Sequence, residues 1–168
     1  MAIGRTTAIE TLEAGHDAVR TLVDRLSRLE LERPATIGGG DWSARDLVGH
    51  LTAWEDHALE ALRAWHAGRG AAIQRALRAE GLNAVNAATA AADRRRPTDE
   101  VLERSDRIHA DLLAVIRALD DTTWNAPPTR RSRRSLGEVL GGILGGPGGP
   151  FAHAGAHLPD LVRYVEGR

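Results

Sequence analysis

Two histidines, His153 and His157, lie four residues apart just after the most Gly- and Pro-rich run of the chain, residues 145–150. Four residues of an α-helix turn about 400°, so both imidazoles would project from nearly the same side of a helix. Such a pair can share a divalent metal ion, but the same spacing also arises by chance on an ordinary helix. A further ligand from a facing helix would favour the metal.

His50 is the best candidate for that further ligand. It falls inside a segment with helical periodicity, close to the apolar stripe, where a histidine is uncommon without a partner. Three neutral imidazoles with one position left open are typical of a catalytic metal site, because structural zinc normally fills four positions. Imidazole discriminates poorly between zinc, nickel and iron. His16 and His57 compete for the third place, and spacing alone does not exclude His57.

The remaining histidines have a simpler interpretation. We expect partly exposed or hydrogen-bonded side chains for His16, His57, His66 and His109.

Three further residues are candidates for the surroundings of the site. A metal-bound histidine usually donates its other N–H to a carboxylate or carbonyl, and Asp46 and Asp160 have suitable spacings from His50 and His157. The alternative is that Asp46 caps a helix and that Asp160 is a solvated charge. Trp54, one turn after His50, is expected in the core or in the pocket wall.

Helices must position these residues. Aromatic residues make up only 4% of the chain, and the apolar positions are mostly Ala, Leu and Val, which favours helices over a β-sandwich. Residues with apolar periodicity of 3–4 predict four main helices, near residues 7–26, 44–65, 98–119 and 151–165.

The helix ends and connections can also be predicted. Thr6 or Thr7 could cap the first helix, which Pro34 and residues 37–41 would end, and Asp41 or Ser43 could cap the second. Residues 71–93 are Ala-rich and plausibly helical, residues 120–135 read as a loop, and residues 136–146 as a short helix. We therefore expect an all-α four-helix bundle, one domain over residues 1–168, with a longer, partly helical connection between its second and third helices.

Composition excludes several classes of function. The net charge of −1 argues against nucleic-acid binding, and the absence of cysteine excludes disulfides and a thiol nucleophile, so any thiol must come from outside. The N-terminal residues include acids and resemble no signal peptide, and no apolar run approaches a membrane span of about 20 residues. We expect a soluble cytoplasmic domain.

Two short motifs contain residues that occur in phosphate sites. The basic segment TRRSRRS, residues 129–135, has no interleaved aromatic residue and is expected to be a solvated loop. The glycine run 141–150 lacks the Gly-Lys-Ser/Thr ending of a phosphate-binding loop.

Two signatures resemble a known family. WSARDLVGHLTAWED, residues 42–56, is similar to the second-helix signature of the DinB/YfiT-like bundle superfamily, in particular its ClbS/DfsB-type branch, and HAGAHLPDLVRYV, residues 153–165, is similar to that branch's last-helix signature. The resemblance implies that His50, His153 and His157 bind a divalent metal and leaves His57 out. The branch often has an aromatic residue after the first histidine of the pair. Here Ala154 and Gly155 follow, which implies a roomier substrate pocket.

The resemblance also implies a function. It predicts a metal-dependent enzyme acting on a small electrophile, either by transfer of an external low-molecular-weight thiol or by hydrolytic detoxification, with the ClbS-type signatures favouring hydrolysis. A metal ion would activate water or a thiol as the nucleophile. The alternatives are a non-catalytic bundle that sequesters a small molecule or forms a homodimer, and a relative that kept the fold but lost the activity. Trp42 and Trp65, expected to be exposed at helix ends, would suit the dimer face.

Overall fold

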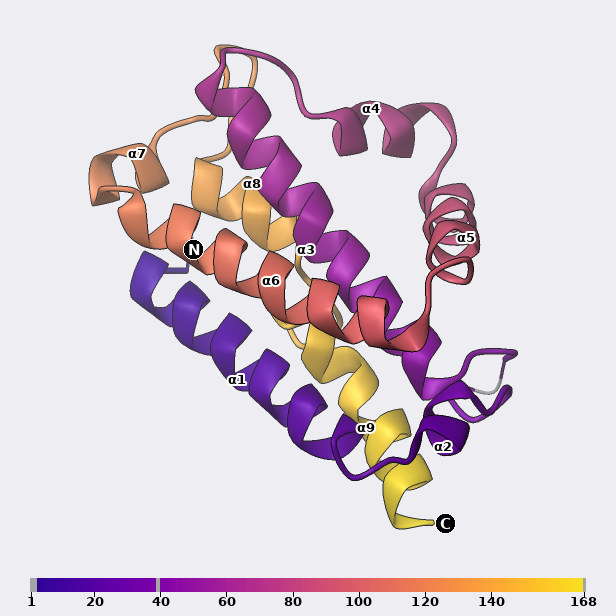
Figure 1. Ribbon diagram of the computed structural model, residues 1–168. Coiled ribbons are helices and arrows are strands. Elements are labelled where there is room, and N and C mark those ends of the chain that lie inside the picture. Colours follow the sequence, from indigo (N-terminus) through magenta and orange to yellow (C-terminus); the bar gives the residue numbers. More distant parts are fainter. Residues whose placement is uncertain (1–2, 39, 168) are drawn as a thin grey trace.

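Four long helices form the bundle (Figure 1). The computed structural model describes residues 3–38 and 40–167, and its regular elements are all helical, with only two isolated β-bridges besides. The long helices are α1 (Arg5–Val23), α3 (Ala44–His66), α6 (Thr98–Ala118) and α9 (His153–Glu166). The shorter ones are α2 (Arg28–Glu32), α4 (Ala72–Ala79), α5 (Leu82–Asp93), α7 (Asp121–Asn125) and α8 (Leu136–Ile143). The predicted all-α bundle is confirmed, and α4 and α5 are the partly helical connection.

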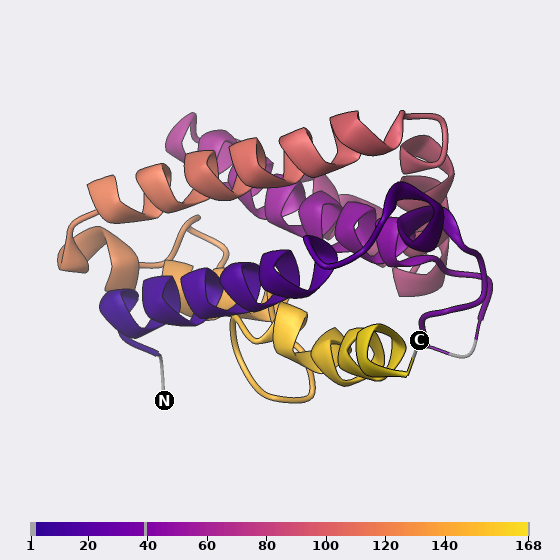
Figure 2. The same cartoon turned by 60° about the horizontal axis from the view of Figure 1, so that its bottom comes forward.

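Two pairs of long helices make the most extensive packing contacts of the bundle. Helix α3 packs most extensively against α6, and α1 packs against α9. Figure 2 shows α1 between α6 and α9. None of the described helices combines the length and the apolar character that a bilayer span requires.

The N-terminus of α3 is fixed by a capping box. The Ser43 hydroxyl accepts a hydrogen bond from the Asp46 amide, and the Ser43 amide donates to Asp46 Oδ2 over 3.0 Å. This pairing satisfies two backbone N–H groups that a helix start would otherwise leave free. The predicted Ser43 cap is thus confirmed, and Asp46 has the capping role that was its alternative interpretation.

Other predicted ends are wrong. Helix α1 begins at Arg5 after Gly4, without a side-chain cap, so neither Thr6 nor Thr7 caps it. The first segment is also divided, because Ser27 forms its own capping box with Glu30 and starts α2. The apolar periodicity of the sequence does not reveal this break, because Leu26 before it and Leu31 after it are both buried.

The segment expected to be a loop before α8 contains α7. The Asp120 carboxylate caps this short helix by accepting from the Thr123 amide over 2.7 Å. Trp124 of α7 is buried, its Nε1–H donates to the Ile3 carbonyl over 3.1 Å, and its ring stacks on Phe151 at 5.8 Å. One tryptophan therefore anchors a segment whose composition predicts a loop.

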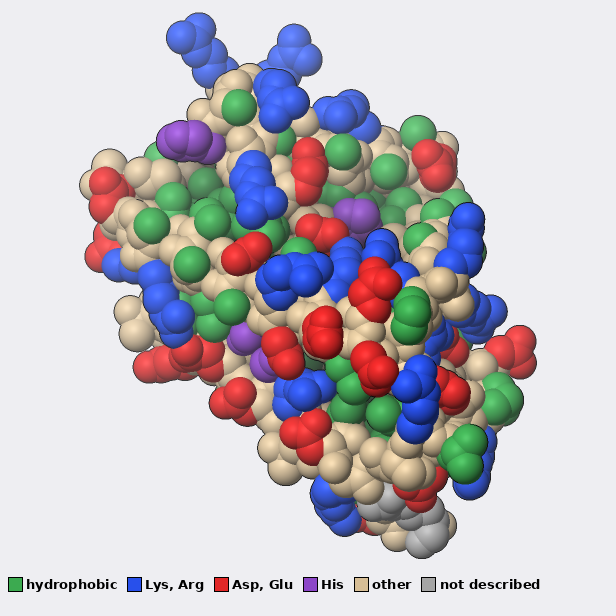
Figure 3. All heavy atoms as spheres, in the orientation of Figure 1, with side chains coloured by type: hydrophobic (Ala, Val, Ile, Leu, Met, Phe, Trp, Pro, Cys, Tyr) green, Lys and Arg blue, Asp and Glu red, His purple; other side chains and the backbone are tan. Residues whose placement is uncertain are grey.

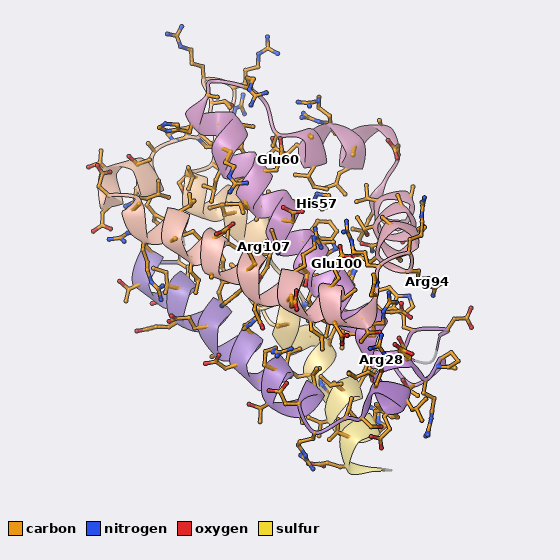
Figure 4. All side chains as sticks on the ribbon, viewed as in Figure 1. Arg28, His57, Glu60, Arg94, Glu100 and Arg107 are labelled. Carbon is orange, nitrogen blue, oxygen red and sulfur yellow. The ribbon has the colours of Figure 1, made fainter. Side chains whose placement is uncertain are left out.

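Charged side chains attach the α5–α6 connection to the start of α3. Asp46 lies 3.6 Å from both Arg45 and Arg94, and Asp93 lies 3.2 Å from Arg96. Gly49 permits this approach, since a Cβ there would lie 3.1 Å from Asp93 Oδ2. Figure 4 shows the charged groups of this end of the molecule, where Arg28, Arg94 and Glu100 are labelled.

The core is divided into two apolar clusters. The first includes Leu12, Trp54 and Phe151, and the second includes Leu47 and Leu161. The polar residue His50 lies between the two clusters, because along α3 it follows Leu47 of the second cluster and precedes Trp54 of the first. The bundle thus carries a polar layer across its interior.

The tryptophans expected at a dimer face are not exposed. Trp65 is only 6% exposed and belongs to the core, and Trp42 is half-buried with its ring 4.8 Å from that of His50. The homodimer stays a prediction, but these two residues do not support it.

Glycines in α8 allow a test of the packing around α7. A Cβ on Gly137 would lie between 2.5 and 2.8 Å from the rigid Trp124 ring, whereas a Cβ on Gly142 meets only Arg134 Nη1 at 3.8 Å. We expect Gly137→Ala to lower the free energy of unfolding by about 1–3 kcal/mol through overpacking. The control Gly142→Ala should leave it unchanged or raise it by up to about 1 kcal/mol. Urea denaturation measures both, and equal effects would contradict the packing described here.

Candidate metal centre

The three histidines singled out from the sequence lie together. His50 Nε2 is 3.1 Å from His153 Nε2, and one ring nitrogen from each of His50, His153 and His157 lies within 4.8 Å of the others. His50 lies in the second turn of α3, while His153 is the first residue of α9 and His157 follows one turn later. Two helices far apart in sequence therefore supply the set.

Ring orientation makes this set suitable for a metal ion. The three ring centroids are 4.9 to 5.3 Å apart, and their planes are inclined by 65° to 81°. Imidazole lone pairs lie in the ring plane, so inclined rings can direct them to a common point. Metal–nitrogen bonds of about 2.1 Å place neighbouring ligand nitrogens about 3.0 to 3.4 Å apart, which matches the His50–His153 separation.

Burial keeps these imidazoles neutral. It lowers the pKa of His50 to about 3, with smaller contributions from His153 and His157, and it lowers the pKa of His153 to about 4, helped by His157. The pKa of His157 is also lowered by burial, against the opposing charge of Asp160. Neutral imidazole is the form that binds a metal ion, so the site is in its ligating state near pH 7.

A second group, His16, Glu55 and His109, also brings three ligating atoms within 4.8 Å. The two histidine rings are stacked at 3.9 Å and inclined by only 6°, so their lone pairs lie in nearly parallel planes and do not converge on one point. His109 Nδ1 lies 3.0 Å from Glu55 Oε1, and His16 Nε2 lies 3.2 Å from Asp106 Oδ1. These histidines are hydrogen-bonded, as predicted, and this group is not arranged for a metal.

Glu55 is the residue of this group that sequence reasoning missed. It lies one turn after Leu51 on α3 and is only partly exposed. The sequence feature that could have indicated Glu55 is an acidic residue beside the apolar stripe of its helix.

The other histidines remain outside both groups. His57 comes from α3 (Figure 4), is half-buried, and packs its ring 5.7 Å from that of Trp54. His66 is exposed at the end of the same helix.

The candidates around the site have different roles. The Asp46 carboxylate is engaged in the capping box and with two arginines, and among the described residues it has no hydrogen bond to His50. Asp160 pairs with Arg163 at 2.9 Å and borders the same cavity as His157. Trp54 Nε1–H donates to Asn86 over 3.1 Å, with its ring 5.9 Å from that of His153, so Trp54 forms pocket wall.

The three histidines border a cavity of about 940 Å³. Its walls include Trp42 and Trp54, residues of α4 and α5, and the loop between α8 and α9. The volume lies within the range of small-molecule sites. Ala154 and Gly155 instead line a separate cavity of about 220 Å³ beside α1, so the extra space expected next to His153 opens there.

The Gly- and Pro-rich run has a structural reason. Gly146 and Gly149 bond to each other in a tight turn, and Gly149 has a φ of 114°, which favours glycine. A Cβ on Gly146 would lie 3.1 Å from that of Ala156, so the turn passes directly over α9. The His153 amide then donates to the Leu144 carbonyl over 3.1 Å, which fixes where α9 begins.

The lowered pKa values predict the pH dependence of stability. The unfolded chain protonates its histidines near pH 6.5, whereas the folded protein keeps His50 and His153 neutral to about pH 3–4. Their contribution is therefore complete above pH 6.5 and is lost as the pH falls from there towards 4. We expect the free energy of unfolding of chelator-treated protein to decline over this range, and less steeply in His50→Gln. Chemical denaturation at several pH values measures it. Exposed His66→Gln is the control, and a His50→Gln curve parallel to wild type would contradict the assignment.

Comparison with known proteins places the chain in a family. The profile of the DinB superfamily matches residues 11–145, which include His50 but end before His153 and His157. Neither curated proteins nor solved structures gave a significant match. The matched residues make up most of the chain and include α3 and α6 in full and the greater part of α1, three of the four long helices of the bundle. The chain belongs to the DinB superfamily, whose members commonly bind metal.

Proposed function

We propose that this protein is a metal-dependent enzyme that acts on a small electrophilic molecule. The observation that supports it is the meeting of three neutral, mutually inclined imidazoles at the wall of a cavity of about 940 Å³. His50, His153 and His157 would hold one divalent ion of zinc, nickel or iron, since imidazole accepts all three.

The chain provides a prepared set of ligands. Three protein ligands leave a coordination position open, as catalytic sites require. A divalent ion bound there supplies Lewis acidity, which lowers the pKa of a water or thiol beside it. Because burial already keeps His50 and His153 neutral, the ion need not displace protons from them.

Neighbouring side chains orient the histidines and provide for proton transfer. Trp42 and Trp54 lie beside the His50 ring, with centroids 4.8 and 6.5 Å away and planes inclined by 54° and 73°, and restrict its rotation. Asp160 is the one carboxylate among the described residues that line the cavity. It lies one turn beyond His157 and would accept the proton released when the nucleophile forms.

Two reactions fit this arrangement. In one, a low-molecular-weight thiol attacks the electrophile. Because the chain has no cysteine, that thiol must be a cosubstrate. In the other, water opens a strained electrophile. The resemblance of residues 42–56 and 153–165 to the ClbS/DfsB-type branch supports the hydrolytic reaction.

Metal content tests the ligand set. We expect tag-free wild type to hold about one equivalent of a single divalent metal. His153→Ala should lose it, and the matched control His57→Ala should keep it, because His57 lies outside the group. Elemental analysis measures all three. A wild type that stays metal-free after incubation with zinc, nickel and iron(II) would overturn the proposal and favour a small-molecule-sequestering bundle.

Turnover tests the activity. Styrene oxide serves as a hydrolysis substrate, and 1-chloro-2,4-dinitrobenzene with cysteine as a thiol-transfer pair. We expect metal-loaded wild type to accelerate one of the two by at least about a hundredfold over His50→Ala, since that variant loses one of three ligands. His57→Ala should retain the activity. Binding of these compounds without turnover in the metal-loaded protein would favour sequestration.

A further inference from the structure

A second large cavity, of about 1,200 Å³, is lined by arginines. It lies between the segment that joins α3 to α4, helix α4 itself, and the loop that precedes α8. No aspartate or glutamate is among its described lining residues. We call its arginines the arginine cluster; they are Arg69, Arg75, Arg78, Arg130, Arg131, Arg133 and Arg134.

The members of the arginine cluster form no close ion pair in the described part of the chain. In the described part of the chain, none of its seven members lies within 4.0 Å of a carboxylate, whereas ten arginines elsewhere do. The two side-chain hydrogen bonds found within the cluster go to backbone carbonyls, from Arg75 to Gly70 and from Arg78 to Gln74. Like charges gathered around one cavity repel each other, and an anion bound there would relieve the repulsion.

The residue type is also informative. All 22 basic residues of the chain are arginine. The planar guanidinium donates two parallel hydrogen bonds to a phosphate or a carboxylate, which an ammonium group does not. Figure 3 shows basic side chains projecting at the upper end of the molecule, where Figure 1 places the loop before α8.

This cavity adjoins the cavity that His50, His153 and His157 border, which we call the histidine cavity. Leu77 of α4 lines both of them. Gly142 of α8 lines the histidine cavity, and a Cβ on it would lie 3.8 Å from Arg134 Nη1. The Arg134 guanidinium therefore lies directly behind the wall of the histidine cavity.

We propose that the arginine cluster binds the phosphate or carboxylate groups of a small molecule whose other end reaches the three histidines. The first part stands on the cluster alone, while the second rests on the proposed function. A small molecule fits better than a nucleic acid because no Phe, Tyr or Trp lines the cavity to stack on bases. The rest of the chain is also strongly acidic once these seven arginines are set aside.

Inorganic pyrophosphate tests the anion site. Titration calorimetry on the full chain, with and without zinc, should show binding that weakens with salt. We expect Arg78→Gln/Arg134→Gln, which removes one guanidinium from each side of the cavity, to bind it roughly tenfold more weakly. The control Arg25→Gln/Arg107→Gln removes the same charge from exposed arginines without an ion pair in the described part; Arg107 is labelled on α6 in Figure 4. Equal weakening of pyrophosphate binding in both variants would mean that binding depends on net charge alone, and it would overturn the proposed anion site.

The same variants distinguish the partner class. A mixed-sequence single-stranded oligonucleotide should bind more weakly than pyrophosphate under the same conditions. Tighter oligonucleotide binding that is lost in Arg78→Gln/Arg134→Gln would overturn the proposal in favour of a nucleic-acid surface.

A pair of thiols tests the connection to the histidines. Phosphopantetheine and pantetheine differ by one phosphate and end in the same thiol. In cobalt-loaded protein, we expect both to give thiolate-to-cobalt charge-transfer absorption, with phosphopantetheine saturating at a roughly tenfold lower concentration. Arg78→Gln/Arg134→Gln should abolish that preference. Phosphopantetheine binding without charge transfer would overturn the connection. A protein that binds pyrophosphate but no metal would refute the proposed function and leave the anion site standing.

Discussion

The burial of imidazole rings inside an apolar bundle is the constraint on which the arrangement depends. His50 is only 6% exposed, between two hydrophobic clusters, and a charged imidazole there would lose most of its hydration. The protein meets this cost by keeping the rings neutral and by turning their nitrogens towards one another. The polar layer therefore consists of neutral imidazoles: His50 and His153 bring their Nε2 atoms within 3.1 Å of each other, and all three rings border the cavity.

Much of the rest of the fold holds this layer in place. The capping box at Ser43 and the arginines around Asp46 fix where α3 starts, and so the height of His50 in the bundle. The turn at Gly146 and Gly149 sets the start of α9, which determines the height of His153. A charged segment at the start of α3 and a segment of glycine and proline before α9 thus place His50 and His153 at the same height in the bundle.

The sequence predicted the long helices because their apolar periodicity reflects burial along one face. The four-residue spacing suggested His153 and His157 as a pair, but spacing alone left the third place open, and the resemblance to the DinB-like family singled out His50. It did not predict α7, because one tryptophan with remote partners, Ile3 and Phe151, outweighs a composition typical of loops. The pairing of His16 with His109 was also not predictable, since it depends on the rotation of α1 against α6. Nor could the arginine cluster be separated from a solvated loop, because Arg69, Arg75 and Arg78 come from a distant segment.

The three histidines are also distributed unequally along the chain. His50 is synthesised first, whereas His153 and His157 belong to α9, and His153 follows His50 by 103 residues. A growing chain can thus assemble α1, α3 and α6 while it offers one imidazole of the three. Any ion that needs all three imidazoles would be captured only once α9 has docked onto α1, so its binding would report that docking.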